Sequence, residues 1–153
     1  MAVDKWLKKL GAPVAELQAA ALERLVDAES LRQTGRYASA ISHGVYSVEI
    51  LLKVLICKHL DLANLPTVFE THDLEALLLY IGLSGTFVGS KSDMNVAKNW
   101  EQVVLVSRQV EGSRYKHDPA WNEIVANEFF LQLRDGQYGV VSCLIREFSK
   151  KTR

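Results

Sequence analysis

Side chains suited to binding an anion gather in one short stretch of this sequence. Between Glu111 and His117 the chain carries two fixed cations, one imidazole and one aromatic ring, on Arg114, Lys116, His117 and Tyr115. Arginine forms two parallel hydrogen bonds to a phosphate, a following helix N-terminus offers backbone N–H groups, and a tyrosine ring stacks on a base. We therefore predict a phosphate or nucleotide site at this turn. The structural alternative is that Arg114 pairs with a carboxylate of a neighbouring helix while Tyr115 packs.

A second group of polar side chains lies earlier in the chain, at Glu49, Lys53, His72 and Asp73. Glu49 precedes Lys53 by four residues, the order and spacing that favour an ion pair on a helix. Their surroundings are apolar, so we expect this pair to be partly buried in a polar network that extends to Arg114. Such a network either positions a ligand or fixes the helices. His72 and Asp73 belong to the first turn of a predicted helix, where His72 lines a cleft or both residues serve helix capping.

Metal and thiol chemistry are not indicated by the spacing of cysteines and histidines. Cys57 and His59 are two residues apart and point to different sides of a helix, and neither Cys-x-x-Cys nor His-Glu-x-x-His occurs. We predict no metal site and no cofactor. Cys57 and Cys143 lie in apolar stretches, which predicts two buried free thiols in a reducing compartment.

The elements that must position these residues follow the helical period. We predict helices at about 14–34, 36–59, 71–83, 93–110, 120–133 and 138–150, after an amphipathic lead-in at 5–10. Gly35 ends the first helix, Thr71 is the expected cap of the third, and Asp118-Pro119 signals the start of the fifth. Residues 84–92 are expected to form a loop. No strand pattern or internal repeat is present, so the sequence predicts an all-α fold.

The second predicted helix is apolar on most of its sides. One line of its residues is apolar at steps of three and four, and a neighbouring line carries small residues that would let another helix approach closely: Ala40, Gly44 and Ser47. A helix of this kind is central in a bundle and is flanked by several others. We therefore expect residues 1–153 to form a single helical domain.

Length, composition and charge exclude several classes of protein. The chain has 153 residues, 48% of them hydrophobic and 24% charged, which is too apolar for intrinsic disorder. Its 18 Lys and Arg balance 18 Asp and Glu, which argues against a protein that coats duplex nucleic acid by charge alone. The N-terminal stretch lacks the apolar core of a signal peptide, and no uninterrupted apolar segment is long enough for a membrane. We expect a cytoplasmic protein without a membrane partner.

Three segments resemble the HEPN domain, a small helical family named for higher eukaryotes and prokaryotes nucleotide-binding proteins. Residues 35–55 resemble the family's second helix, with Ser47, Glu49, Leu52 and Lys53 at the family's spacing. Thr71-His72-Asp73-Leu74 is similar to the opening of its third helix. Trp100 and Ser113-Arg114-Tyr115 resemble the Trp and Arg-Tyr element of one branch. The resemblance spans residues 35 to 117.

This resemblance implies a fold and a set of functions. The family fold is an antiparallel, up-and-down four-helix bundle, here with one or two additional short helices, and it is usually a homodimer. Some members are associated with nucleotide binding or with a partner nucleotidyltransferase. On this basis we expect a non-catalytic domain that binds a nucleotide or a protein partner, as one half of a nucleotidyltransferase or toxin–antitoxin type of module.

A ribonuclease is the first alternative, because many HEPN domains cleave RNA without metal. Their signature is an Arg, four to six intervening residues and a His near the start of the last long helix, paired across a dimer. Here Arg114 and His117 are separated by two residues only, and no His follows Arg134 or Arg146. Arg36 and His43 have the spacing but lie on the second helix. A nuclease would therefore use Arg114 with His117, or Arg36 with His43. A scaffold bundle without a ligand is the other alternative.

Overall fold

The computed structural model describes residues 10–89, 92–113, 117 and 121–151, and this part of the chain is mostly helical. Its helices are α2 (Val14–Gln33), α3 (Tyr37–His59), α4 (Leu74–Tyr80), α5 (Ser84–Phe87), α6 (Met94–Gly112), α7 (Glu123–Arg134) and α8 (Val140–Lys151), with a 3₁₀ turn, η1 (Thr67–Phe69). Two short strands, β1 (Leu10–Pro13) and β2 (Asn64–Pro66), were not predicted. The prediction of an all-α fold is confirmed apart from this small strand pair.

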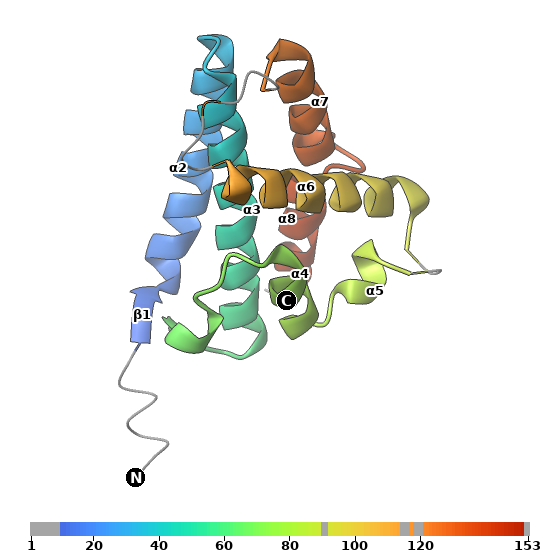
Figure 1. Ribbon diagram of the computed structural model, residues 1–153. Coiled ribbons are helices and arrows are strands. Elements are labelled where there is room, and N and C mark those ends of the chain that lie inside the picture. The colour runs from blue at the N-terminus through green and yellow to red at the C-terminus, as the bar shows by residue number, and fades with distance from the viewer. Residues whose placement is uncertain (1–9, 90–91, 114–116, 118–120, 152–153) are drawn as a thin grey trace.

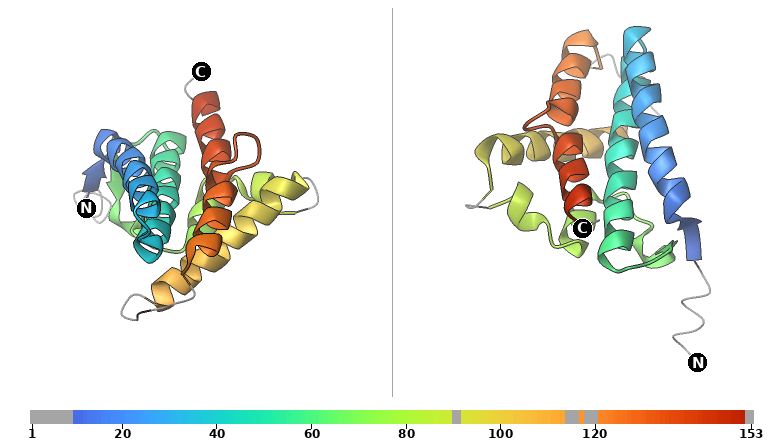
Figure 2. Two further views of the ribbon diagram at one scale, coloured as in Figure 1. Left: turned by 90° about the horizontal axis from the view of Figure 1, so that it is seen from above. Right: turned by 180° about the vertical axis from the view of Figure 1, so that it is seen from behind.

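Helix α3 lies at the centre of the molecule. Helix α2 runs beside it, while α7 and α8 follow one another on another side of α3 and α6 runs across the direction of α2 and α3 (Figure 1, Figure 2). Fourteen of the 23 residues of α3 are buried, as expected for a central helix. The predicted central position of this helix is confirmed. An antiparallel, up-and-down four-helix bundle is not confirmed, because α6 does not run along the direction of α2 and α3.

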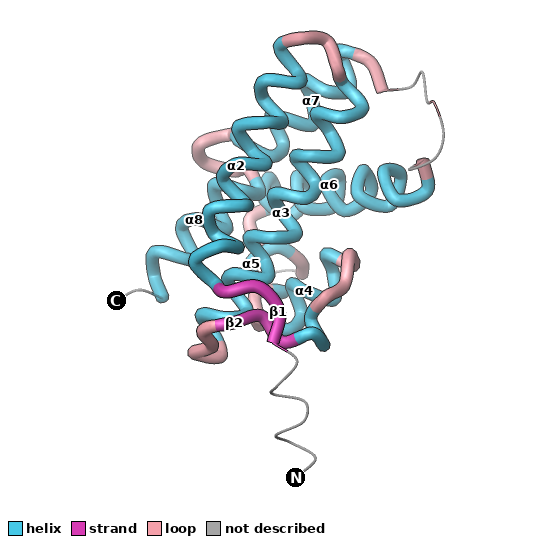
Figure 3. The backbone as a smooth tube through the Cα atoms, turned by 90° about the vertical axis from the view of Figure 1, so that its left-hand side faces the viewer, coloured by secondary structure: helices cyan, strands magenta, loops and turns pink. Residues whose placement is uncertain are grey.

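The strand pair ties the start of α2 to the connection after α3. β1 and β2 are antiparallel, with Leu10 opposite Pro66 and Pro13 opposite Asn64 (Figure 3). The backbone N–H of Val14 also donates to the carbonyl of Ala63 at 2.9 Å. Strands of four and three residues are too short to show a clear alternation of apolar and polar residues, so the sequence did not predict them.

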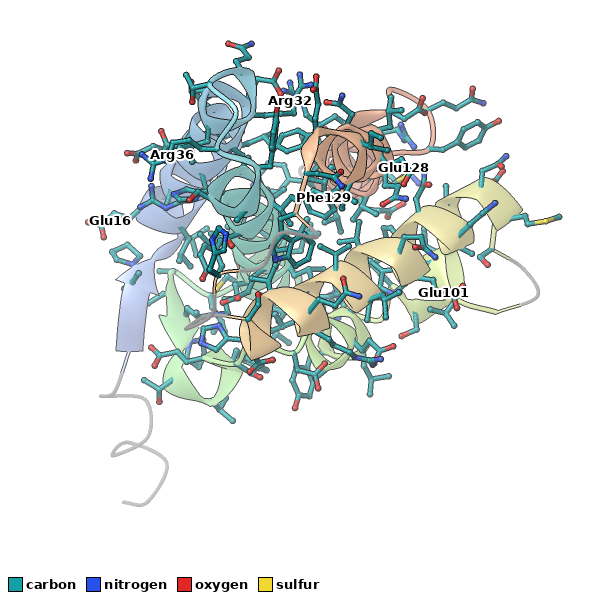
Figure 4. The ribbon with its side chains drawn as sticks, turned by 45° about the horizontal axis from the view of Figure 1, so that its top comes forward. Glu16, Arg32, Arg36, Glu101, Glu128 and Phe129 are labelled. Carbon is teal, nitrogen blue, oxygen red and sulfur yellow. The ribbon has the colours of Figure 1, made fainter. Side chains whose placement is uncertain are left out.

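The small residues of α3 permit a close approach of α7. A Cβ atom built on Gly44 would lie 2.7 Å from Cε1 of Phe129 and 2.9 Å from Cδ1 of Leu133. Figure 4 shows Phe129 between α7 and the central helices. The close helix contact predicted for this line of α3 is therefore confirmed at Gly44.

Several helix boundaries differ from those predicted. Helix α4 begins at Leu74, because Asp73, and not Thr71, accepts the backbone N–H groups of Glu75 and Ala76. Helix α7 begins at Glu123, where Asn122 is the cap, and so starts three residues later than predicted. Residues 84–87, expected in a loop, form the short helix α5.

Helix α3 is also the one described helix that is long and apolar enough to cross a membrane. Its mean hydropathy over the best window is 1.5, and 78% of that window is buried inside the fold. The core helix of a water-soluble protein has the same length and composition, so this feature is weak evidence for a membrane span.

Candidate functional site

A buried carboxylate on α3 connects two donors from different parts of the chain. Glu49 accepts from Nζ of Lys53 at 2.6 Å through Oε1 and binds Nδ1 of His72 at 3.0 Å through Oε2. The side chains of Glu49 and Lys53 are 9% and 10% exposed, whereas that of His72 is 58% exposed. The structure therefore brings together three residues that the sequence singled out, and it buries the predicted Glu49–Lys53 pair.

The contact with Glu49 determines which nitrogen of His72 faces other groups. A carboxylate beside a lysine accepts hydrogen bonds, so Nδ1 of His72 carries the proton of the neutral ring. Nε2 is then the nitrogen with a free lone pair. Because His72 lines an open cleft, Nε2 is the ring nitrogen that is left for a hydrogen bond to a group bound there.

The turn before α4 holds His72 in this position. Thr71 Oγ1 accepts from the backbone N–H of Asp73 at 3.2 Å, and Asp73 Oδ1 accepts from Glu75 and Ala76 at 3.1 Å. Leu74, the first residue of α4, is 2% exposed and anchors the helix in the core. The sequence offered helix capping as an alternative function of His72 and Asp73. Asp73 alone caps α4, and the His72 ring contacts Glu49 instead.

A cleft of about 490 Å³ opens beside His72, between the turn before α4 and the C-terminal half of α6. Its charged lining consists of three carboxylates and one guanidinium besides the imidazole: Glu70, Asp73, Glu111, Arg108 and His72. Arg108 Nη2 pairs with Glu75 Oε2 at 2.5 Å. Without further cations the cleft is acidic, and it suits hydrogen-bond donors better than a free phosphate.

The last turns of α6 lead from this cleft to the predicted anion-binding turn. Val110 and Glu111 line a small gap together with Glu49, His72 and Tyr46. Helix α6 ends at Gly112, and Ser113 follows as its C-cap. The turn that carries the predicted cations therefore begins beside the Glu49–His72 pair.

Only one of the four predicted residues of that turn belongs to the part of the chain that the structure describes. Arg114, Tyr115 and Lys116 lie outside the described residues, so the predicted contact of Arg114 with the Glu49 network is untested. His117 is described and exposed. Sequence reasoning did not identify Arg108 or Thr71 as cleft residues, because an exposed arginine on a helix and a threonine in a turn carry no distinguishing signal.

The other spacing match, Arg36 with His43, is not assembled as a site by any contact in the described part of the chain. Arg36 is exposed beside the start of α3 (Figure 4). Nδ1 of His43 lies 2.8 Å from the carbonyl oxygen of Ser39, so the ring is bound to its own helix. This geometry gives the pair no special relation to a substrate.

Both cysteines are buried free thiols, as predicted. Burial raises the pKa of the Cys57 thiol above its usual value. Burial also raises the pKa of Cys143, against the opposing effect of the nearby Arg146 guanidinium. Thiols held in the protonated form are poor nucleophiles and metal ligands. Among the described residues no group of three or more His, Cys, Asp or Glu is arranged to hold a metal ion.

Comparison with known proteins identifies no relative. The chain matches no protein-family model, no curated protein and no solved structure. The function must therefore be inferred from the residues of the cleft and from the sequence resemblance described above.

Proposed function

We propose that this protein is a non-catalytic, HEPN-like domain that binds a nucleotide in the cleft between α4 and α6. The observation that carries the proposal is the Glu49–His72 hydrogen bond, which holds an imidazole at the edge of this cleft. A purely structural ion pair between Glu49 and Lys53 does not require a third, half-exposed partner from another element. The finer arrangement, a HEPN-type bundle with α2, α3, α6 and the α7–α8 segment as its long helices, is part of this proposal.

The division of charge supports a ligand with two chemically different ends. The described cleft offers the carboxylates of Glu70 and Glu111, which accept hydrogen bonds from ribose hydroxyls or base amino groups. Arg114 and Lys116 follow α6 in the sequence and supply the cations that a phosphate needs. A nucleotide carries both sets of groups, whereas inorganic phosphate carries only one.

Isothermal titration calorimetry with a panel of nucleoside mono- and triphosphates tests the proposal. We expect one nucleotide to bind, Arg114→Ala/Lys116→Ala to abolish binding, and His72→Ala to weaken it about tenfold, the effect of one lost hydrogen bond to a charged network. Arg134→Ala removes a cation of α7 that pairs with Glu29 and does not line the cleft, so it is the matched control and should bind as the wild type does. Absence of binding by the whole panel would contradict the proposal.

A divergent, metal-independent ribonuclease is the second candidate. The observation that favours it is the same hydrogen bond, because a carboxylate that orients an imidazole prepares it for proton transfer. Incubation with end-labelled single-stranded RNA in EDTA distinguishes the two functions. Cleavage that disappears in Arg114→Ala/His117→Ala or in His72→Ala would establish the nuclease, and intact RNA would leave the binding domain.

The partner and setting are proposals drawn from the resemblance. We propose a cytoplasmic homodimer that works with a nucleotidyltransferase or another protein in a toxin–antitoxin type of module. Co-purification of the chain with the product of a neighbouring gene, followed by mass spectrometry, tests this setting. A scaffold without any ligand is the function that would remain if neither nucleotide nor RNA binds.

A further inference from the structure

The outer side of α6 carries a stripe of four exposed residues. Met94, Lys98, Glu101 and Leu105 follow one another at steps of four, three and four, which places them on one line of the helix. Met94 is 82% exposed and Leu105 is 46% exposed. Figure 4 shows Glu101 on this outer side of α6. Among the described residues, Lys98 and Glu101 have no ion-pair partner.

A groove of about 800 Å³ runs along this stripe. One wall is the stripe itself, and the other includes Phe87 of α5 and Val88, which is 53% exposed. From Met94 to Leu105 a helix extends about 16 Å. The groove thus offers a surface about three helical turns long, with exposed apolar side chains at both ends and opposite charges in the middle.

The order of residues in the stripe is complementary to itself. If two copies of α6 lie antiparallel about a twofold axis between Asn99 and Trp100, residue 94 faces residue 105 and residue 98 faces residue 101. Met94 then meets the partner's Leu105, and Lys98 meets the partner's Glu101. The twofold axis repeats both contacts, so one helix pair contains two apolar contacts and two ion pairs. No like charges of the stripe face each other in this register.

We propose that this face of α6 binds a second copy of the chain, as an antiparallel, twofold-symmetric helix pair. An interface of this kind uses the same patch on both subunits. The contact covers the two most exposed apolar positions of α6, which otherwise face water. Its area is at the small end for protein interfaces, so we expect a dissociation constant on the order of micromolar or weaker. This interface specifies the homodimer proposed above and rests on that part of the proposed function, but it does not depend on nucleotide binding.

Reversal of the two central charges tests the register. In Lys98→Glu two glutamates face each other at each symmetric contact, and in Glu101→Lys two lysines do. By sedimentation velocity over a concentration series, we expect each variant to dimerise at least tenfold more weakly than the wild type. A mixture of the two variants restores opposite charges at both contacts and should form a heterodimer. The double variant Lys98→Glu/Glu101→Lys should dimerise as the wild type does.

The matched control is Glu128→Lys, which reverses an exposed charge on α7 (Figure 4). It should leave the dissociation constant unchanged. Both stripe positions are exposed, and circular dichroism checks that the variants keep their helix content. A wild type that is monomeric at about 1 mM would overturn the proposal. A dimer that tolerates each single reversal, or variants that fail to associate when mixed, would overturn it equally.

Discussion

Glu49 is a single carboxylate that satisfies two donors, one buried and one at the edge of a cleft. If Glu49 is replaced by Ala, Nζ of Lys53 loses its anion in a nearly buried position. Removal of one partner of a buried ion pair costs about 3–5 kcal/mol. We therefore expect Glu49→Ala to lower the free energy of unfolding by that amount in urea denaturation.

Two further variants separate this effect from a simple loss of charge. Glu75→Ala removes the partner of Arg108 in an exposed pair, and it should cost at most about 1 kcal/mol. Glu49→Ala/Lys53→Met removes both buried charges and should be more stable than Glu49→Ala alone. Equal losses in Glu49→Ala and Glu75→Ala would contradict the structural importance assigned to this residue.

The two thiols provide a prediction about reactivity. Because burial raises the pKa values of Cys57 and Cys143, both remain protonated at neutral pH in the folded protein. A disulfide reagent such as DTNB should therefore react slowly with the native protein and quickly in guanidinium chloride. The stability that the buried thiols contribute is full below the thiol pKa of the unfolded chain and is lost as the pH rises through the higher folded-state pKa. Equal native and denatured reaction rates would show that the thiols are accessible.

The polar network could be predicted from the sequence only in part. Glu49 and Lys53 are four residues apart on one helix, so the helical period alone predicts their contact. His72 lies 23 residues beyond Glu49, and their contact depends on how the chain turns through β2 and η1. Local patterns carry no information about that path, so the sequence selected both His72 and Glu49 but did not predict their contact.

At the scale of the elements, the close contact between α3 and α7 makes Gly44 sensitive to substitution. A Cβ atom at this position meets Phe129 and Leu133 at less than 3.0 Å, so the side chains of α7 must shift. Overpacking of this kind costs about 1–3 kcal/mol. We expect Gly44→Ala to lower the midpoint of urea unfolding accordingly.

Gly112 is the matched control, because it is also a helical glycine but a Cβ atom added to it would meet nothing within 4 Å apart from its chain neighbours and the backbone of its own helix. Gly112→Ala should leave stability unchanged or raise it by up to about 1 kcal/mol through helix propensity. If both substitutions act alike, the contact between α3 and α7 is looser than the structure indicates.

Helix ends were predictable where one cap residue was available and ambiguous where several were. Gly35, with φ of 77°, separates α2 from α3 where the sequence indicated. Before α4 both Thr71 and Asp73 are good caps, and local preference does not decide between them. The burial of Leu74 selects Asp73, which is a tertiary effect.

At the scale of the whole molecule, an ion-pair network joins α2 to α7, where Nη1 of Arg134 lies 3.8 Å from Oε2 of Glu29. Arg32 bonds Glu29 within α2, donates to Oδ1 of Asn127 at 2.8 Å and lies 5.2 Å from the centre of the Phe130 ring (Figure 4). The hydrogen bond from Arg32 is the main cause that lowers the pKa of Glu29 below 4.5. Protonation of Glu29 at low pH should therefore weaken the contacts between these two helices and lower the stability of the fold.

The sign of this linkage gives a prediction for acid unfolding. A lowered folded-state pKa contributes stability that is present above the unfolded pKa and is lost as the pH falls through the folded-state pKa. We expect stability to decline below about pH 4.5, and Glu29→Gln to weaken that decline. Glu16→Gln, on the exposed side of α2, is the control and should follow the wild type. Urea unfolding at a series of pH values measures both, and identical curves for Glu29→Gln and the wild type would contradict the linkage.

The direction of α6 is the global feature that the sequence could not supply. Its buried side contains Val96, Trp100 and Val103, but a buried side is compatible with any crossing direction. Side chains from all the long helices nevertheless belong to a single hydrophobic cluster. We expect this cluster to unfold in one cooperative transition.

The central claim is that His72 contacts a nucleotide in the cleft beside Glu49. The most direct measurement is the NMR signal of the His72 imidazole nitrogens during titration with the nucleotides of the panel. We predict a saturable shift of Nε2 while Nδ1 keeps its bond to Glu49, and we expect Arg114→Ala/Lys116→Ala to abolish the shift. An imidazole signal that stays unchanged through the titration with every nucleotide would contradict this claim.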